Sequence, residues 1–125
     1  MTKEIKSVAV LGGGTMGAGI AGLCAERDIP VLILEMNESA VEAAKDRLIN
    51  GKPAPIDNPE KLSNIDTGTF DKDLDKLKDY DWICEAIIEN ADAKRDLIKR
   101  VEKVRSDASI LTSNTCLLYT SDAAD

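Results

Sequence analysis

The chain of 125 residues contains no histidine and only three cysteines, Cys24, Cys84 and Cys116. The cysteines form no C-x-x-C pair and match no spacing of metal ligands, so neither a metal site nor a disulfide framework is expected. Cys24 and Cys84 lie within apolar runs, which favours positions in the core over a role as nucleophiles.

Long apolar runs and an excess of positive charge are also missing. No stretch approaches the roughly 18 apolar residues of a membrane span, and residues 1–14 lack the apolar segment of a secretory signal. Asp and Glu number 23 against 16 Lys and Arg, a formal net charge of −7, which argues against nucleic acid or an anionic membrane as the partner. We therefore expect a cytoplasmic protein that binds neither nucleic acid nor a membrane. Any phosphate group of a ligand is then expected to be held by local features of the site.

Apolar runs alternate with helical patterns along the chain. The runs predict buried strands over residues 8–11, 30–35, 81–88 and 109–114. A further short strand is predicted near residues 62–65. Helical spacing predicts three helices, which begin near Thr15, Asn37 and Asp92. This alternation predicts an α/β fold with a Rossmann-type, doubly wound and mainly parallel sheet.

Two of these helices carry more detailed expectations. In the first, Met16, Ile20, Leu23 and Cys24 fall at the spacing of one apolar face, and the glycines among them suggest close approach to a sheet. In the second, Ser39 and Glu42 have the spacing of a capping box.

A glycine-rich turn joins the first strand to the first helix. The segment GGGTMG supplies Gly12, Gly14 and Gly17 in the G-x-G-x-x-G pattern, in the strand–turn–helix context that a dinucleotide fingerprint requires. Gly12 would permit the tight turn, Gly14 the approach of a pyrophosphate to the backbone, and Gly17 close packing of helix on strand. Because the phosphates would lie at the positive end of the helix, Thr15 and Met16 are included in the expected site.

An acidic residue, Glu35, ends the second strand about 20 residues after the glycines, where a carboxylate accepts hydrogen bonds from the adenine ribose hydroxyls. Such a carboxylate repels a 2′-phosphate, and the segment EMNESA offers no Arg or Lys to bind one. The pattern therefore predicts NAD, not NADP, as the cofactor. The alternative is that Glu35 merely ends the strand in solvent.

Three further motifs identify a family. VAVLGGGTMGAGIA, DWICEAIIENADAKRDLIKRVE and ILTSNT, in this order, closely resemble the NAD-binding domain of the L-3-hydroxyacyl-CoA dehydrogenases of fatty-acid β-oxidation, over residues 5–115. KPAPI and TGTFDKDLDKLKDYDWI are most similar to the bacterial branch that is fused to an enoyl-CoA hydratase. The resemblance implies an oxidoreductase that converts (S)-3-hydroxyacyl-CoA to 3-oxoacyl-CoA with NAD, and a homodimer as one option for the complete protein.

The resemblance also implies roles for individual residues. Glu89 and Lys94 match the Glu and Lys with which the family contacts its cofactor, and Asn114 matches part of the wall beside the nicotinamide. Without the resemblance, Glu89 would be an acidic residue at a helix start, Lys94 a solvated lysine and Asn114 a strand-end cap.

The last ten residues depart from the family. Where relatives continue from SNT with serine, this chain has Cys116, and residues 116–125, CLLYTSDAAD, match the translation of a transposase adapter used in sequencing libraries. We interpret residues 1–115 as the N-terminal part of an NAD-binding domain, incomplete at its C-terminal end, and 116–125 as a non-native tail. The family's catalytic histidine and its partner glutamate lie beyond this point, so this polypeptide is expected to be inactive.

Two other functions fit the same residues. One is a non-enzymatic module that binds a dinucleotide, and the other is an NAD-dependent dehydrogenase of a different β-hydroxyacid, because one fold hosts many chemistries.

Overall fold

The computed structural model describes residues 5–51, 56, 58–87 and 91–113. Its five strands form one parallel sheet in the order β3-β2-β1-β4-β5, and they are β1 Val8–Leu11, β2 Val31–Glu35, β3 Ile65–Thr69, β4 Trp82–Glu85 and β5 Ile110–Ser113. The helices are α1 Thr15–Glu26, α2 Glu38–Asn50, α3 Phe70–Asp73 and α4 Ala91–Val104, with the 3₁₀ segments η1 Pro59–Asn64 and η2 Leu74–Asp79. The predicted α/β, doubly wound parallel sheet is confirmed.

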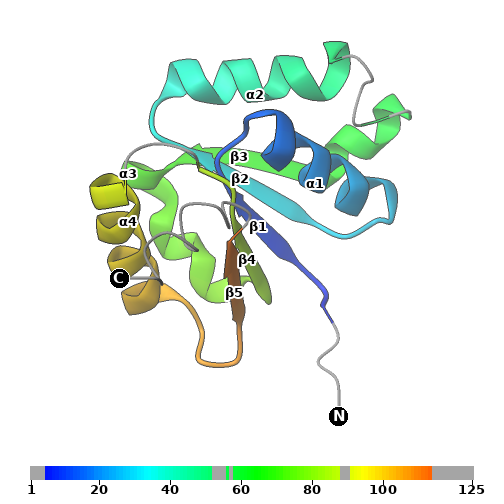
Figure 1. Ribbon diagram of the computed structural model, residues 1–125. Helices are drawn as coiled ribbons and strands as arrows, with labels where there is room; N and C mark the ends of the chain where they lie inside the picture. Colours follow the sequence, from blue (N-terminus) through cyan, green and yellow to red (C-terminus); the bar gives the residue numbers. More distant parts are fainter. Residues whose placement is uncertain (1–4, 52–55, 57, 88–90, 114–125) are drawn as a thin grey trace.

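Helices cover both faces of the sheet (Figure 1), which is why the inner strands β1 and β2 are apolar on both sides. Val8 and Val10 of β1 belong to the core cluster shared with α1 and α2. Ala9 and Leu11, which alternate with them, belong to the second cluster, shared with α3, η2 and α4. The parallel register pairs Leu11 with both Leu34 of β2 and Glu85 of β4, so the carboxyl ends of the three central strands lie together.

Helix α1 packs on the sheet through small residues, and the predicted apolar face is wrong in part. Met16 is 53% exposed and Leu23 is 56% exposed, because the buried stripe consists instead of Gly17, Ala18, Ala21, Gly22, Cys24 and Ala25. Small side chains on this stripe let the helix axis approach the strands closely, and the two large apolar side chains are directed outward.

Helix α2 begins at a different cap from the one predicted. The side chain of Asn37 accepts a hydrogen bond from the Ala40 N–H at 2.8 Å, so Asn37 is the N-cap and Ser39 lies inside the helix. A capping box of Ser39 and Glu42 would have started the helix two residues later. Asn at the N-cap satisfies an orphan N–H as well as Ser does.

The third strand lies later in the chain than predicted. Residues 59–64 form η1, and strand β3 occupies Ile65–Thr69. Pro59 at the first turn of η1 favours a helical start, and Asn58 caps it by accepting the Glu60 N–H at 3.0 Å.

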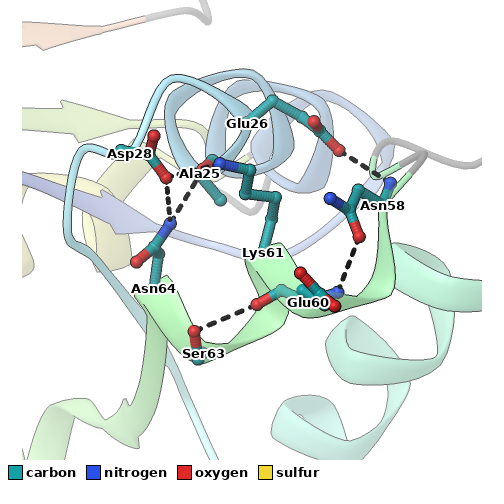
Figure 2. Close-up of polar contacts among 8 residues, drawn as sticks. All are labelled: Ala25, Glu26, Asp28, Asn58, Glu60, Lys61, Ser63 and Asn64. Atoms are coloured by element: carbon teal, nitrogen blue, oxygen red, sulfur yellow. Dashed lines mark hydrogen bonds and ion pairs between the residues drawn. The ribbon is translucent and has the colours of Figure 1, made fainter.

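Segment η1 is tied to the end of α1 by polar contacts (Figure 2). Lys61 Nζ lies 2.6 Å from Asp28 Oδ1, and Asn64 Nδ2 donates to the Ala25 carbonyl at 2.9 Å. Glu26 Oε1 accepts the Asn58 N–H at 3.1 Å. Asp28 has a positive φ of 63°, a left-handed conformation that Asp and Asn tolerate better than most residues. The turn after α1 therefore serves as an anchor for the segment that leads into β3.

Asp28 provides a test of this anchor that separates its backbone from its side chain. Asp28→Gly removes the carboxylate and suits the positive φ, whereas Asp28→Ala removes the carboxylate and strains the backbone. We expect Asp28→Gly to unfold at a lower urea concentration than the wild type at pH 7, and Asp28→Ala at a lower concentration still. Equal midpoints for the two variants would contradict the backbone contribution.

The pH dependence of stability in the wild type and in Asp28→Gly tests the contribution of the Asp28 carboxylate. The hydrogen bond from Lys61, followed by that from Asn64, lowers the pKa of Asp28 below its ordinary 3.8. Its contribution to stability is thus complete above pH 3.8 and is lost as pH falls through the lower folded pKa. The gap between wild type and Asp28→Gly should narrow over that acidic range.

Both described cysteines lie in the core, as predicted. Cys24 and Cys84 are buried and free, and burial raises the pKa of each thiol. A raised pKa disfavours the thiolate, which is the nucleophilic form.

Two further predictions concern the non-native tail and membrane-spanning segments. Residues 114–125 lie outside the described residues, so the interpretation of 116–125 as a non-native tail stays a prediction. Among the helices that are described, none has the length and apolar character needed to cross a membrane.

Candidate dinucleotide-binding site

A cavity of about 440 Å³ opens at the carboxyl ends of β1, β2 and β4. Strand order reverses at β1, since β2 lies on one side of it and β4 on the other, and ligands of open α/β sheets bind at such a reversal. The described residues that line the cavity are Gly12, Gly14, Thr15, Met16, Glu35, Met36, Ala40, Ala43, Arg47, Ala86 and Ile87.

Two of the predicted glycines are required by the packing of the fold, independently of any ligand. Gly12 has a φ of +101°, and a Cβ there would lie 3.0 Å from Ile87 Cγ1 and 3.2 Å from the Ala86 carbonyl oxygen. At Gly17, a Cβ would overlap the Gly12 carbonyl oxygen and lie 3.2 Å from Val10 Cγ1. These positions agree with the expected tight turn and close helix packing.

Gly14 differs, because a Cβ there would meet nothing within 4 Å. Its backbone is extended, with φ −68° and ψ −170°, and it is the N-cap of α1 without a side-chain cap. Thr15 and Met16 are exposed beside it on the first turn of the helix, which contains no acidic residue. The protein thus leaves an open cradle at a helix N-terminus, which suits a phosphate group in charge and in shape.

Glu35 projects from the end of β2 into the same loop. Its Oε2 accepts a hydrogen bond from the Gly13 N–H at 2.5 Å, while the Gly12 N–H donates to the Leu34 carbonyl at 2.8 Å. The structure therefore brings Glu35 together with Gly12 and Gly14 on the wall of one cavity, whereas Gly17 is not among the described residues that line it.

Arg47 lines the cavity but was not predicted, because it lies outside the segment EMNESA, residues 35–40, in which Arg and Lys were sought. It lies on α2, and its Nη1 donates to the Gly13 carbonyl oxygen at 2.8 Å, across 34 residues of sequence. Helical periodicity could have found it, because Ala40, Ala43 and Arg47 follow at spacings of 3 and 4 and therefore share one face of α2.

A buried polar cluster lies at the ends of β4 and β5. Glu85 is fully buried, and its Oε2 accepts the Ile87 N–H at 2.5 Å while its Oε1 accepts the Ser113 hydroxyl at 2.7 Å. Lys94 of α4 is 4% exposed, with its Nζ 3.5 Å from Glu85 Oε1. Lys94 is not among the described residues that line the cavity. Glu85 was not predicted, although an acidic residue inside the apolar run DWICEAII is a signal that could have indicated it.

Two predicted site residues, Glu89 and Asn114, lie outside the described residues. The cofactor contacts assigned to them by the resemblance stay predictions, as does the contact assigned to Lys94.

Comparison with known proteins places these features in a family. Residues 7–125 match the family model described as 3-hydroxyacyl-CoA dehydrogenase, NAD binding domain. A probable 3-hydroxyacyl-CoA dehydrogenase of Deinococcus radiodurans is 40% identical over 119 residues, which are 90% of this chain and 34% of that protein. A putative fatty acid oxidation complex trifunctional enzyme of Rickettsia felis is 34% identical over 125 residues, 94% of this chain and 17% of that protein.

Solved structures agree with this result. The (S)-3-hydroxybutyryl-CoA dehydrogenase of Ralstonia eutropha superposes with a TM-score of 0.71 at 32% identity, covering 90% of this chain and 41% of that one. The chain spans about a third or less of the length of the two curated relatives named above. NAD is the cofactor of the matched domain, and the open cradle at Gly14 fits its pyrophosphate. The chain therefore belongs to the family of NAD-binding domains of the 3-hydroxyacyl-CoA dehydrogenases.

Proposed function

We propose that this chain provides the NAD site of an enzyme that oxidises (S)-3-hydroxyacyl-CoA to 3-oxoacyl-CoA in fatty-acid β-oxidation. The observation that carries the proposal is the cavity at the reversal of strand order, with Gly14 open and Glu35 on its wall. NAD supplies the acceptor for the hydride of the 3-hydroxyl carbon. An acyl-CoA substrate, a cytoplasmic location and a homodimer of the complete protein belong to this proposal as well.

Each described residue would act by holding the cofactor. Gly14, Thr15 and Met16 would surround the pyrophosphate at the start of α1, where exposed N–H groups favour an anion. Glu35 would exchange the Gly13 N–H for the ribose hydroxyls, or would bind both, because a carboxylate has several acceptor positions.

The resemblance to the family implies a histidine as the base that takes the hydroxyl proton. The 125 residues contain no histidine. We therefore expect this polypeptide to bind NADH and to turn over no acyl-CoA. The names of the relatives support a dehydrogenase over a non-enzymatic binding module.

A fluorescence titration with NADH and NADPH tests the cofactor site. We expect NADPH to bind at least about tenfold more weakly, because the Glu35 carboxylate repels a 2′-phosphate, and tenfold corresponds to about 1.4 kcal/mol. Glu35→Gln removes the charge and should reduce this discrimination. Glu38→Gln, an exposed residue at the start of α2, is the matched control and should leave it unchanged. Equal affinity of the wild type for the two cofactors would contradict the role of Glu35.

A further inference from the structure

Residue Gly13 is held from both sides by side chains that line the cavity. Glu35 accepts its N–H at 2.5 Å, and Arg47 donates to its carbonyl oxygen at 2.8 Å. Glu35 comes from the end of β2 and Arg47 from the last turn of α2, so two separate elements fix one residue of the loop. Gly13 is itself buried, with α2 so near that a Cβ would overlap Ala44.

The hydrogen bond from Arg47 fixes the orientation of one peptide unit. The Gly13 carbonyl and the Gly14 N–H belong to the same planar trans peptide, in which the two groups point in opposite directions. Because the carbonyl is directed at Arg47, the Gly14 N–H is directed away from it. Gly14 lines the cavity and has open space at its Cα, so this N–H is a donor available at the cradle.

The charges of the cavity point to the same residue. Among the described lining residues, Glu35 carries the negative charge and Arg47 the positive one. A pyrophosphate adds further negative charge, and the chain as a whole carries −7. The half-buried Arg47 guanidinium thus offsets Glu35 in a site that must accept an anion.

We propose that Arg47 is a positioning residue for the pyrophosphate of the dinucleotide: it orients the Gly13–Gly14 peptide and compensates the charge of Glu35. This inference rests on the proposed NAD site. It assigns Arg47 to recognition of the phosphates, and it predicts little effect on the adenosine part of the ligand.

Titrations of the ¹⁵N-labelled chain with ADP-ribose and with adenosine, followed by NMR, test this assignment. Arg47→Met should weaken ADP-ribose binding by about tenfold, the effect of one charge-assisted hydrogen bond, and adenosine binding by less than about twofold. Arg47→Lys keeps the charge and should recover most of the affinity for ADP-ribose. The control is Lys45→Met, an exposed residue on α2 whose replacement changes the net charge equally.

The outcomes separate the two levels of inference. If the wild type binds ADP-ribose and Arg47→Met binds it equally well, or loses both ligands to the same degree, Arg47 has no specific role with the phosphates. If the wild type binds neither ADP-ribose nor NADH, the proposed function itself is wrong, and the role of Arg47 is rejected with it.

Discussion

Gly14→Val is expected to lower the affinity for NADH by about a hundredfold or more while the domain keeps its stability. The valine side chain would occupy the cradle where backbone N–H groups approach the pyrophosphate, and loss of the charged hydrogen bonds there costs about 1.5–3 kcal/mol each. The fold does not oppose the substitution, because a Cβ meets nothing within 4 Å and the φ of −68° suits any residue. The change in unfolding free energy should stay within about 1 kcal/mol.

Gly19→Val is the matched control for this experiment. Gly19 also has open space at its Cα and lies exposed on α1, but it is not among the described residues that line the cavity. Fluorescence titration should give wild-type affinity for Gly19→Val, and urea unfolding should show both variants folded. Unchanged NADH affinity of Gly14→Val would place the pyrophosphate elsewhere.

Of the substitutions considered, Lys94→Met is expected to lower the free energy of unfolding most, by about 3–5 kcal/mol as measured by urea unfolding. The substitution removes the cation that lies 3.5 Å from the fully buried Glu85 carboxylate. Desolvation of that charge is then no longer offset by this partner. Since a typical domain is stable by only about 5–15 kcal/mol, the variant should be close to unfolding at room temperature.

A double-mutant cycle identifies the ion pair as the cause. Glu85→Gln keeps the side-chain shape and an acceptor for the Ile87 N–H or the Ser113 hydroxyl, but it removes the negative charge. Glu85→Gln combined with Lys94→Met should cost clearly less than the sum of the two single changes. Lys99→Met, an exposed lysine on the same helix, is the control and should be nearly neutral. Additive losses would show that Lys94 acts independently of Glu85.

The sheet and the glycine residues were predictable because they depend on local chemistry. Continuous apolar runs specify strands that are buried on both faces. Gly12 and Gly17 lie where a side chain would clash with neighbouring atoms, so these positions require glycine. Glu35 was predictable from its distance along the chain to these glycines. Each of these inferences uses a pattern that spans one strand–helix–strand unit.

The residues that were not predicted depend on contacts between distant segments. Arg47 reaches Gly13 across 34 residues, and Glu85 meets Lys94 and Ser113 from two other elements. The small-residue face of α1 was mistaken because apolar spacing does not tell which of two possible stripes the sheet can approach. The boundary of β3 was misplaced because Asn58 and Pro59 start a 3₁₀ segment where an apolar pattern alone favours a strand.

The sequence distances within the cavity have a kinetic consequence. Most of its lining residues lie between Gly12 and Arg47, and the hydrogen bonds that hold Gly13 also lie within this range. The contacts with Gly13 close loops of 22 and 34 residues, which are shorter than the loops that bring Ala86 and Ile87 to Gly12 and therefore cost less closure entropy. We therefore expect the glycine loop to form with the first strand–helix–strand–helix segment, before β4 and the following Ala86 and Ile87 complete one wall of the cavity.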